Sequence, residues 1–143
     1  MMSDADVASI LSHCRTIAVV GLSPKPERAS FDVARYMQAQ GYRIIPVNPN
    51  AGTLQILGET VYPNLLEASK IATIDLVNCF RNSADIPPIV DEAITVNAKA
   101  LWMQLGVTHS AAAAKAQAAG LTVVQNRCLK IDHRAWRVKH QGR

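Results

Sequence analysis

The stretch Thr16 to Ser30, TIAVVGLSPKPERAS, decides the fold because it reads as a strand, a glycine loop and the start of a helix. The apolar run from Ile17 to Val20 is typical of a parallel strand buried on both faces. Gly21 stops the strand, and Ser30 is placed to cap the next helix. A dinucleotide-binding fold would continue with two more glycines in the pattern G-x-G-x-x-G. Here basic and hydroxyl side chains stand in their place, which indicates a similar corner with a different ligand.

The same alternation of strand and helix continues along the chain. We expect further strands over 43–47, 74–80, 100–104 and 121–124, with a short extra strand over 60–62. Helical patterns cover 3–14, 30–40, 64–68, 85–94 and 110–119. This order predicts an α/β, Rossmann-like, doubly wound parallel sheet of about five strands with helices on both faces, most simply in the order 3-2-1-4-5.

The length of the chain fits one domain over residues 1–143, with a core over about 10–133 and a basic tail over 134–143. The N-terminus has no secretory pattern, and no apolar run is long enough to span a bilayer. Cys14, Cys79 and Cys128 have no C-x-x-C spacing, which indicates reduced thiols in a cytoplasmic protein without a zinc site or membrane contact. The apolar N-terminal helix suggests a homodimer as one option.

The net charge of +4 is concentrated at the C-terminus. Six of the fifteen Lys and Arg residues lie in the last seventeen positions, so the rest of the chain is close to neutral. Such a tail can bind RNA, acidic lipid or a partner protein. Because Trp136 is the only aromatic residue among the basic ones, a solvated tail is preferred and nucleic-acid binding is disfavoured.

The ends of the predicted strands hold the candidate binding residues, because ligands of such sheets bind beyond the carboxyl ends of the strands beside the first one. These ends read Gly21-Leu22-Ser23, Val47-Asn48-Pro49, Phe80-Arg81-Asn82, Gln104-Leu105-Gly106 and Asn126-Arg127-Cys128. The set contains no carboxylate, whereas an NAD-binding fold places Asp or Glu after its second strand. Plain NAD is therefore disfavoured.

Basic residues around the same edge favour a ligand with several phosphates. Lys25, Arg28, Arg81 and Arg127 can project towards one rim, and the helix that starts near Ser30 adds free N–H groups. Gly21 lets backbone amides approach a pyrophosphate, to which hydroxyl groups of the loop can donate. Coenzyme A (CoA), with a pyrophosphate and a 3′-phosphate, fits this description, and NADP fits it less well but remains open.

Five motifs together resemble a known family. GLSPKPERAS, IIPVNPN, the V-x-x-F-R-N-S of Val77 to Ser83, LWMQLGV and VVQNRC occur in the right order and spacing. They resemble the small stand-alone CoA-binding proteins related to the N-terminal domain of the succinyl-CoA synthetase alpha subunit. The resemblance covers roughly residues 10 to 133. No part of the chain corresponds to the second, catalytic domain of the synthetase.

The resemblance implies a role for each motif. Gly21, Ser23, Lys25, Arg28 and Ser30 would hold the phosphates, while Val47, Asn48 and Pro49 would lie along the adenosine. Phe80 and Arg81 would flank the nucleotide, and Gln104 and Gly106 would form the floor under the pantetheine. In the synthetases a lysine shortly after the proline of the second strand contacts the nucleotide. Asn50 and Ala51 stand here instead, so Lys25 or Arg28 would have to bind the 3′-phosphate.

The sequence thus favours non-catalytic binding of CoA or an acyl-CoA, with an NADP-dependent oxidoreductase or nucleotide sensor as the alternative. Arg127 and Cys128 complete the candidate site. Beside Arg127, the thiol of Cys128 has two interpretations: a thiolate that forms a mixed disulfide with CoA, or a small buried side chain, which we prefer. We expect Trp102 to belong to the core.

Overall fold

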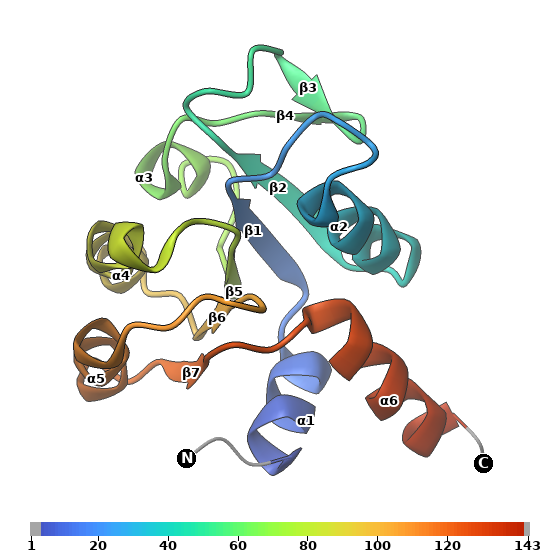
Figure 1. Ribbon diagram of the computed structural model, residues 1–143, viewed down its shortest axis with the longest axis vertical. Helices are drawn as coiled ribbons and strands as arrows, with labels where there is room; N and C mark the ends of the chain where they lie inside the picture. The colour runs from blue at the N-terminus through green and yellow to red at the C-terminus, as the bar shows by residue number, and fades with distance from the viewer. Residues whose placement is uncertain (1–3, 142–143) are drawn as a thin grey trace.

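A parallel sheet between two layers of helices makes up the computed structural model, which describes residues 4–141 (Figure 1). Its five strands are β1 (Thr16–Val20), β2 (Arg43–Val47), β5 (Leu76–Cys79), β6 (Ala100–Met103) and β7 (Thr122–Val124). Every pair of neighbours in this sheet is parallel. The strands are short apolar runs, as expected where helices exclude water from both faces. The α/β fold class predicted from the sequence is confirmed.

The order of the strands differs from the simplest expectation. The sheet runs β2-β1-β5-β6-β7, which is 2-1-3-4-5 when its strands are counted along the chain, instead of 3-2-1-4-5. The third strand, β5, pairs with β1 from Ile17↔Leu76 to Val20↔Cys79. The helix between β1 and β2 lies on one face of the sheet, and the helices before β5 and β6 lie on the other. Because crossovers are right-handed, β2 and β5 are therefore placed on opposite sides of β1. Strand order therefore reverses between β1 and β5.

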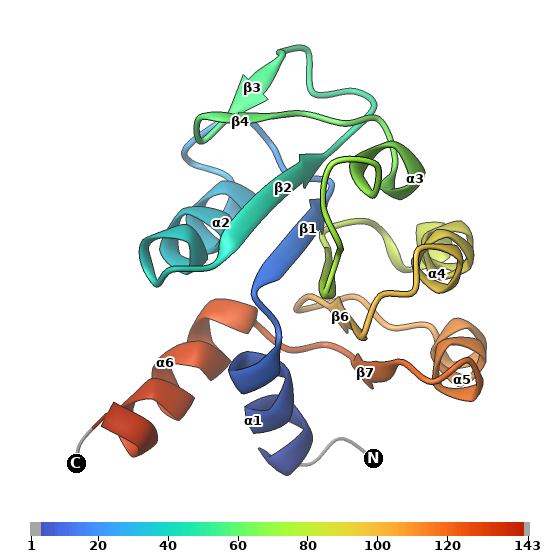
Figure 2. The same cartoon turned by 180° about the vertical axis from the view of Figure 1, so that it is seen from behind.

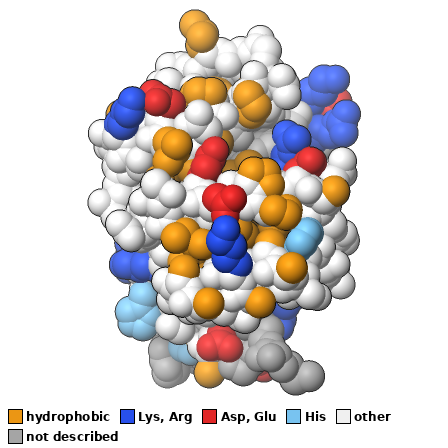
Figure 3. Space-filling model, turned by 90° about the vertical axis from the view of Figure 1, so that its left-hand side faces the viewer, with side chains coloured by type: hydrophobic (Ala, Val, Ile, Leu, Met, Phe, Trp, Pro, Cys, Tyr) orange, Lys and Arg blue, Asp and Glu red, His pale blue; other side chains and the backbone are white. Residues whose placement is uncertain are grey.

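The helices divide evenly between the faces of the sheet (Figure 2). One layer contains α1 (Asp4–His13), α2 (Ala29–Ala39) and α6 (Leu129–Gln141). The other contains α3 (Leu65–Ala68), α4 (Ile86–Thr95) and α5 (Ser110–Ala118), with the short helix η1 (Ser83–Asp85) before α4. The alanines of α5 let it pack closely on the sheet. Figure 3 faces the α3–α5 layer, where hydrophobic and charged side chains are intermixed.

Two further features lie outside the main sheet. β3 (Gln55–Ile56) and β4 (Glu59–Thr60) form a small antiparallel hairpin beyond β2, so the extra strand expected at 60–62 begins one residue earlier. Tyr62 forms a parallel bridge with Val47 along the outer side of β2. The proposed cap of the first helix, Ser3, lies outside the described residues. None of the helices in the described part of the chain has the length and hydropathy needed to cross a bilayer.

The C-terminal segment is the largest departure from the sequence-based expectation, because α6 occupies most of the predicted solvated tail. Its contact with α2 depends on polar aromatic groups instead of an apolar stripe. His133 is buried, and its Nδ1 lies 2.8 Å from the hydroxyl of Tyr36. Burial, followed by the nearby charge of Arg137, lowers the pKa of this imidazole. Leu129 is fully buried and Trp136, seven residues later on the same side of the helix, packs against the same core, so the segment carried an amphipathic pattern that the prediction overlooked.

The apolar face of α1, which suggested a homodimer, is used within the chain. Val7, Ile10 and Leu11 are all buried in the core on the α1–α2–α6 side. The reason to expect that this face pairs two copies is therefore removed.

Candidate functional site

The strand register brings four predicted site residues to one edge of the sheet. Val20 pairs with both Val47 and Cys79, and Cys79 pairs with Met103. The residues that follow these strand ends are Gly21, Asn48, Phe80 and Gln104. Motifs separated by more than eighty residues in the sequence thus lie in one row, beside the reversal of strand order where α/β sheets bind ligands.

Gly21 is required by a close approach of two backbones. Its φ is +88°, and a Cβ at this position would lie only 2.3 Å from the carbonyl oxygen of Phe80. Its N–H donates to the carbonyl oxygen of Val47 at 2.8 Å. The glycine therefore lets the loop after β1 pass directly over the end of β5. No side chain of residue 21 stands between the two backbones there.

The loop after Gly21 is held by its own hydroxyl groups. The Oγ of Ser30 accepts a hydrogen bond from the N–H of Ser23 at 3.0 Å, and the Oγ of Ser23 accepts one from Lys25 N–H at 3.1 Å. The expectation that Ser30 caps α2 is wrong, because the helix begins at Ala29 with Arg28 at the cap position. Ser30 is buried, while Lys25 and Arg28 are exposed on the loop.

Three adjoining hollows open along this edge. The polar hollow, of about 340 Å³, is lined by Gly21, Asn48, Asn50, Phe80, Arg81, Asn82 and Asp85. The small cavity, of about 230 Å³, is lined by Val20, Val47, Pro49, Pro63, Asn64, Arg81, Asp85, Pro88, Ile89 and Glu92. The large cavity, of about 560 Å³, is lined by Ala29, Asp32, Val33, Phe80, Arg81, Asn82, Gln104, Leu105, Val107, Cys128, Lys130, Ile131 and Arg134. Arg81 lines all three.

Arg81 is the point where the hollows meet. Its guanidinium lies 3.4 Å from the carboxylate of Asp85, and both side chains are more than a third exposed. Such a pair contributes little to stability, so the guanidinium can exchange this partner for a ligand. No carboxylate was expected at the strand ends. Asp85 reaches the edge because η1 turns the chain back one turn after β5.

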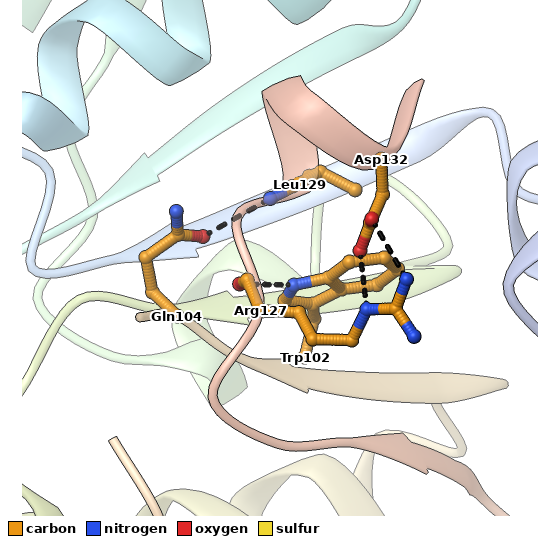
Figure 4. A network of polar contacts seen from close by, with 5 residues as sticks. All are labelled: Trp102, Gln104, Arg127, Leu129 and Asp132. Atoms are coloured by element: carbon orange, nitrogen blue, oxygen red, sulfur yellow. Dashed lines mark hydrogen bonds and ion pairs between the residues drawn. The ribbon is translucent and has the colours of Figure 1, made fainter. Parts of the chain in front are cut away.

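Helix α6 closes the large cavity, and a polar network fixes the start of that helix (Figure 4). The indole N–H of Trp102 donates to the carbonyl oxygen of Arg127 at 2.8 Å. The Oε1 of Gln104 accepts from the N–H of Leu129 at 3.5 Å. The guanidinium of Arg127 binds Asp132 through two hydrogen bonds of 2.8 and 2.9 Å. Trp102 is fully buried, as expected for a core residue.

Six of the predicted residues do not line the three hollows. Ser23, Lys25, Arg28 and Ser30 lie on the loop after Gly21 and at the start of α2, whereas Gly106 and Arg127 have structural contacts elsewhere. The side chain of Arg127 lies with Asp132 against a separate cavity between α1 and α6. The N–H of Gly106 donates to the Oδ1 of Asn126 at 2.7 Å, which connects the loops after β6 and β7. Asn126 is in the left-handed region, with a φ of +57°.

Several residues of the large cavity were missed because they lie on helices. Asp32 comes from α2, and Lys130, Ile131 and Arg134 come from the unpredicted α6. The ammonium of Lys130 lies 2.9 Å from the carboxylate of Asp32. The hydrogen bond from Lys130 lowers the pKa of the Asp32 carboxyl and outweighs the opposing effect of burial. A signal was present in the spacing of Lys130 and Arg134, which are one helical turn apart.

The three thiols are free and differ in their surroundings. Cys128 is half-buried and lines the large cavity. Burial, with the charge of Asp75 second, raises the pKa of Cys14 to about 11. Complete burial raises the pKa of Cys79 to about 12. Cys128 is therefore the thiol placed to meet a ligand or a reagent.

These features define a class. An open parallel sheet, hollowed at its carboxyl edge where the strand order reverses, is a Rossmann-like α/β domain with its crevice at the usual position. The model of the CoA binding domain family matches residues 15–134, and the chain belongs to that family.

The chain is also similar to the following proteins. The chain is 37% identical over 131 residues to the Bacillus subtilis protein "Uncharacterized protein YneT", a match that covers 92% of this chain and 94% of the relative. A solved structure titled "hypothetical protein from Pyrococcus horikoshii OT3" is 36% identical, with a TM-score of 0.88 and coverage of 94% and 92%. A dinucleotide-forming acetyl-coenzyme A synthetase of Ca. Korarchaeum cryptofilum is similar in fold alone, at 19% identity and a TM-score of 0.64. That match covers 76% of this chain and 25% of the synthetase.

Proposed function

We propose that the protein binds CoA or an acyl-CoA at the carboxyl edge of its sheet, without catalysing a reaction on it. The observation that carries this proposal is the set of three adjoining hollows that meet at Arg81. CoA likewise has three chemically distinct parts, namely an adenosine, a diphosphate and a pantetheine arm. The number, order and polarity of the hollows match those parts in a chain that belongs to the CoA-binding family.

The diphosphate would lie in the polar hollow. Gly21 brings backbone close to this space, Arg81 supplies a positive charge, and the side-chain amides of Asn48, Asn50 and Asn82 surround it. The Nδ2 of Asn48 already donates to the carbonyl oxygen of Leu22 at 3.0 Å, so this amide is held in a fixed orientation. Fixed donors bind phosphate oxygens without a large loss of side-chain entropy.

The adenine and the pantetheine arm would lie on opposite sides of this hollow. Pro49, Pro63, Pro88 and Ile89 give the small cavity apolar walls suited to a flat base. Glu92 and Asp85 offer carboxylate oxygens to an exocyclic amine. The large cavity, with Phe80 at its entrance and Cys128 on its wall, would receive the arm and the thiol or thioester.

Lys25 and Arg28 remain proposed contacts of the 3′-phosphate, because they extend from the loop that adjoins the polar hollow. Arg28→Ala should weaken CoA binding by about tenfold to a hundredfold, the value of one hydrogen bond to a charged group. The same variant should leave the affinity for dephospho-CoA unchanged. Equal losses for both ligands would assign Arg28 to another part of the site.

Isothermal titration calorimetry with CoA, dephospho-CoA and NADPH tests the function. We expect CoA to bind with saturable heat and to raise the melting temperature, because a ligand that binds only the folded state stabilises it. Absence of binding by CoA and acetyl-CoA, combined with binding of NADPH, would overturn the proposal in favour of an NADP-dependent protein. The cytoplasmic location expected from the cysteine pattern stays a prediction.

A further inference from the structure

The mouth of the large cavity exposes two large apolar side chains. Leu105, which follows β6, is 59% exposed, and Ile131, in the first turn of α6, is 58% exposed. The described residues include six exposed large hydrophobic side chains in all, and these two line the same cavity. Clustered apolar exposure at the rim of a pocket is typical of a surface that a ligand covers.

The interior of the cavity continues this apolar surface. Val107 and Val33 form its walls beside Phe80, and the backbone of α6 beyond Leu129 is fixed by the network around Trp102. Its volume of about 560 Å³ is larger than those of the polar hollow and the small cavity. Phe80, Arg81 and Asn82 line both this cavity and the polar hollow, so the two spaces adjoin.

The charges at the cavity are largely balanced. Lys130 is paired with Asp32 at 2.9 Å, and Arg81 is paired with Asp85 at 3.4 Å. Arg134 lies on the rim and is exposed to solvent, where a charge attracts a carboxylate only weakly. The electrostatics therefore favour an uncharged group in the apolar part of the cavity over a second carboxylate.

We propose that the preferred ligand is an acyl-CoA with an uncharged hydrocarbon chain, and that this chain lies against Leu105, Val107 and Ile131. The inference rests on the proposed function, because it assigns the large cavity to the distal end of the same ligand. Free CoA would extend its pantetheine arm into the large cavity but would leave Leu105 and Ile131, at the mouth of that cavity, in water. Each methylene that covers them removes apolar surface from water on both partners.

A series of thioesters provides the test. Binding of CoA, acetyl-CoA, butyryl-CoA and hexanoyl-CoA to the full chain is measured by calorimetry. Burial of one methylene is worth about 0.8 kcal/mol, so the affinity should rise by about threefold to fourfold per methylene from acetyl to hexanoyl. Succinyl-CoA, in which a carboxylate replaces the terminal methyl group of butyryl-CoA, should bind more weakly than butyryl-CoA.

Matched variants assign the chain to the cavity. Leu105→Ala and Ile131→Ala should each reduce hexanoyl-CoA affinity by about threefold to tenfold more than they reduce CoA affinity, because the hydrocarbon chain covers these side chains. The controls are Leu54→Ala, at a side chain 86% exposed in the segment before β3, and Val138→Ala, 75% exposed further along α6. Both control variants should retain the chain-length dependence of the unaltered protein.

The outcomes separate this inference from the proposed function. Binding of CoA with no gain from chain length would overturn the acyl preference and leave CoA binding intact. Tighter binding of succinyl-CoA than of butyryl-CoA would also overturn it, in favour of a carboxylated acyl group. Failure of CoA and of every thioester to bind would overturn both.

Discussion

The two edges of the sheet are built in opposite ways. At the amino edge, Asp75 precedes β5, and its Oδ2 accepts hydrogen bonds from the backbone N–H groups of Arg15 at 2.8 Å and Thr16 at 3.0 Å. Lys99, before β6, lies 3.5 Å from the other carboxylate oxygen. The side chain of Asp75 thus connects the starts of three adjacent strands, β1, β5 and β6, and its contacts occupy this part of the amino edge.

At the carboxyl edge, the same strands end in a row of small and amide residues with three hollows around Arg81. The charged pair there, Arg81 with Asp85 at 3.4 Å, is longer than the two backbone hydrogen bonds of Asp75, and the side chain of Asp85 is 40% exposed whereas that of Asp75 is 13% exposed. The difference indicates that the amino edge serves stability and that the carboxyl edge is left available for a ligand. Four predictions test this division, in order of decreasing effect.

Gly21→Ala should have the largest effect, because Gly21 contributes both to the stability of the fold and to the ligand site. The new methyl group would lie 2.3 Å from the carbonyl oxygen of Phe80, at a φ of +88°. We expect a loss of about 3 kcal/mol or more in the free energy of unfolding, from strain and overpacking together. CoA binding should be lost as the end of β5 moves away. Urea denaturation and calorimetry measure the two effects.

Gly41→Ala is the matched control for that variant. Gly41 has a φ of +97° but no heavy atom within 4 Å of the added Cβ. In Gly41→Ala the free energy of unfolding should fall only by the cost of the left-handed conformation, about 1–2 kcal/mol. Equal losses at the two positions would show that the close approach at Gly21 is unimportant.

Asp75→Ala should destabilise the protein by about 3 kcal/mol without changing the affinity for CoA, because two backbone N–H groups lose a charged acceptor. Asp91→Ala, which removes the exposed ion pair with Lys115, should cost less than about 1 kcal/mol. Urea denaturation of the two variants at pH 7 provides the comparison. Weakened CoA binding in Asp75→Ala with an unchanged fold would contradict the division between the edges.

The effect of Asp75 should also depend on pH. Burial raises the pKa of this carboxyl, but hydrogen bonds from Arg15 and Thr16 and the charge of Lys99 outweigh it and lower the pKa. The ionised group therefore stabilises the fold above the ordinary carboxyl range, and this contribution is lost as the pH falls through the folded-state pKa. The stability difference between the original protein and Asp75→Ala should shrink from pH 7 towards about pH 3.

Arg81→Ala should reverse this pattern, with weaker binding and unchanged stability. Loss of a charged hydrogen bond to the diphosphate should reduce CoA affinity by about tenfold to a hundredfold. The free energy of unfolding should change by less than about 0.5 kcal/mol. Arg43→Ala, at an exposed position at the amino end of β2, is the control and should bind CoA normally. Normal CoA binding by Arg81→Ala would remove Arg81 from the site.

The smallest effect should be protection of Cys128 from alkylation. Cys14 and Cys79 are buried with raised pKa values, so Cys128 should react first with iodoacetamide. Saturating CoA should slow that reaction by about tenfold or less, because the pantetheine arm would cover one wall of the cavity. Mass spectrometry follows the reaction, and Cys128→Ser should remove its fast phase. An unchanged rate in the presence of bound CoA would place the arm outside the large cavity.

Much of the architecture could be predicted because local patterns carry it. Apolar runs bounded by Gly21 and Pro49 marked β1 and β2, and Asn64 caps α3 as expected through its bond to the N–H of Glu67. The row of strand ends followed from the fold class, since parallel strands place their carboxyl ends together. Helix α6 was missed because its buried face combines Leu129 with His133 and Trp136 among many basic residues, and His133 and Trp136 dock by polar and aromatic contacts.

By itself, the sequence determined the alternation of strands and helices, the class of sheet, and which motifs stand at its carboxyl edge. These follow from short-range rules of hydrophobic period, capping and turn chemistry. Only the tertiary structure decided the strand order, the position of Asp85 beside Arg81, and the separation of Arg127 from the three hollows. Those features depend on which face each crossover helix covers and on contacts between residues distant in the chain, which local pattern does not encode.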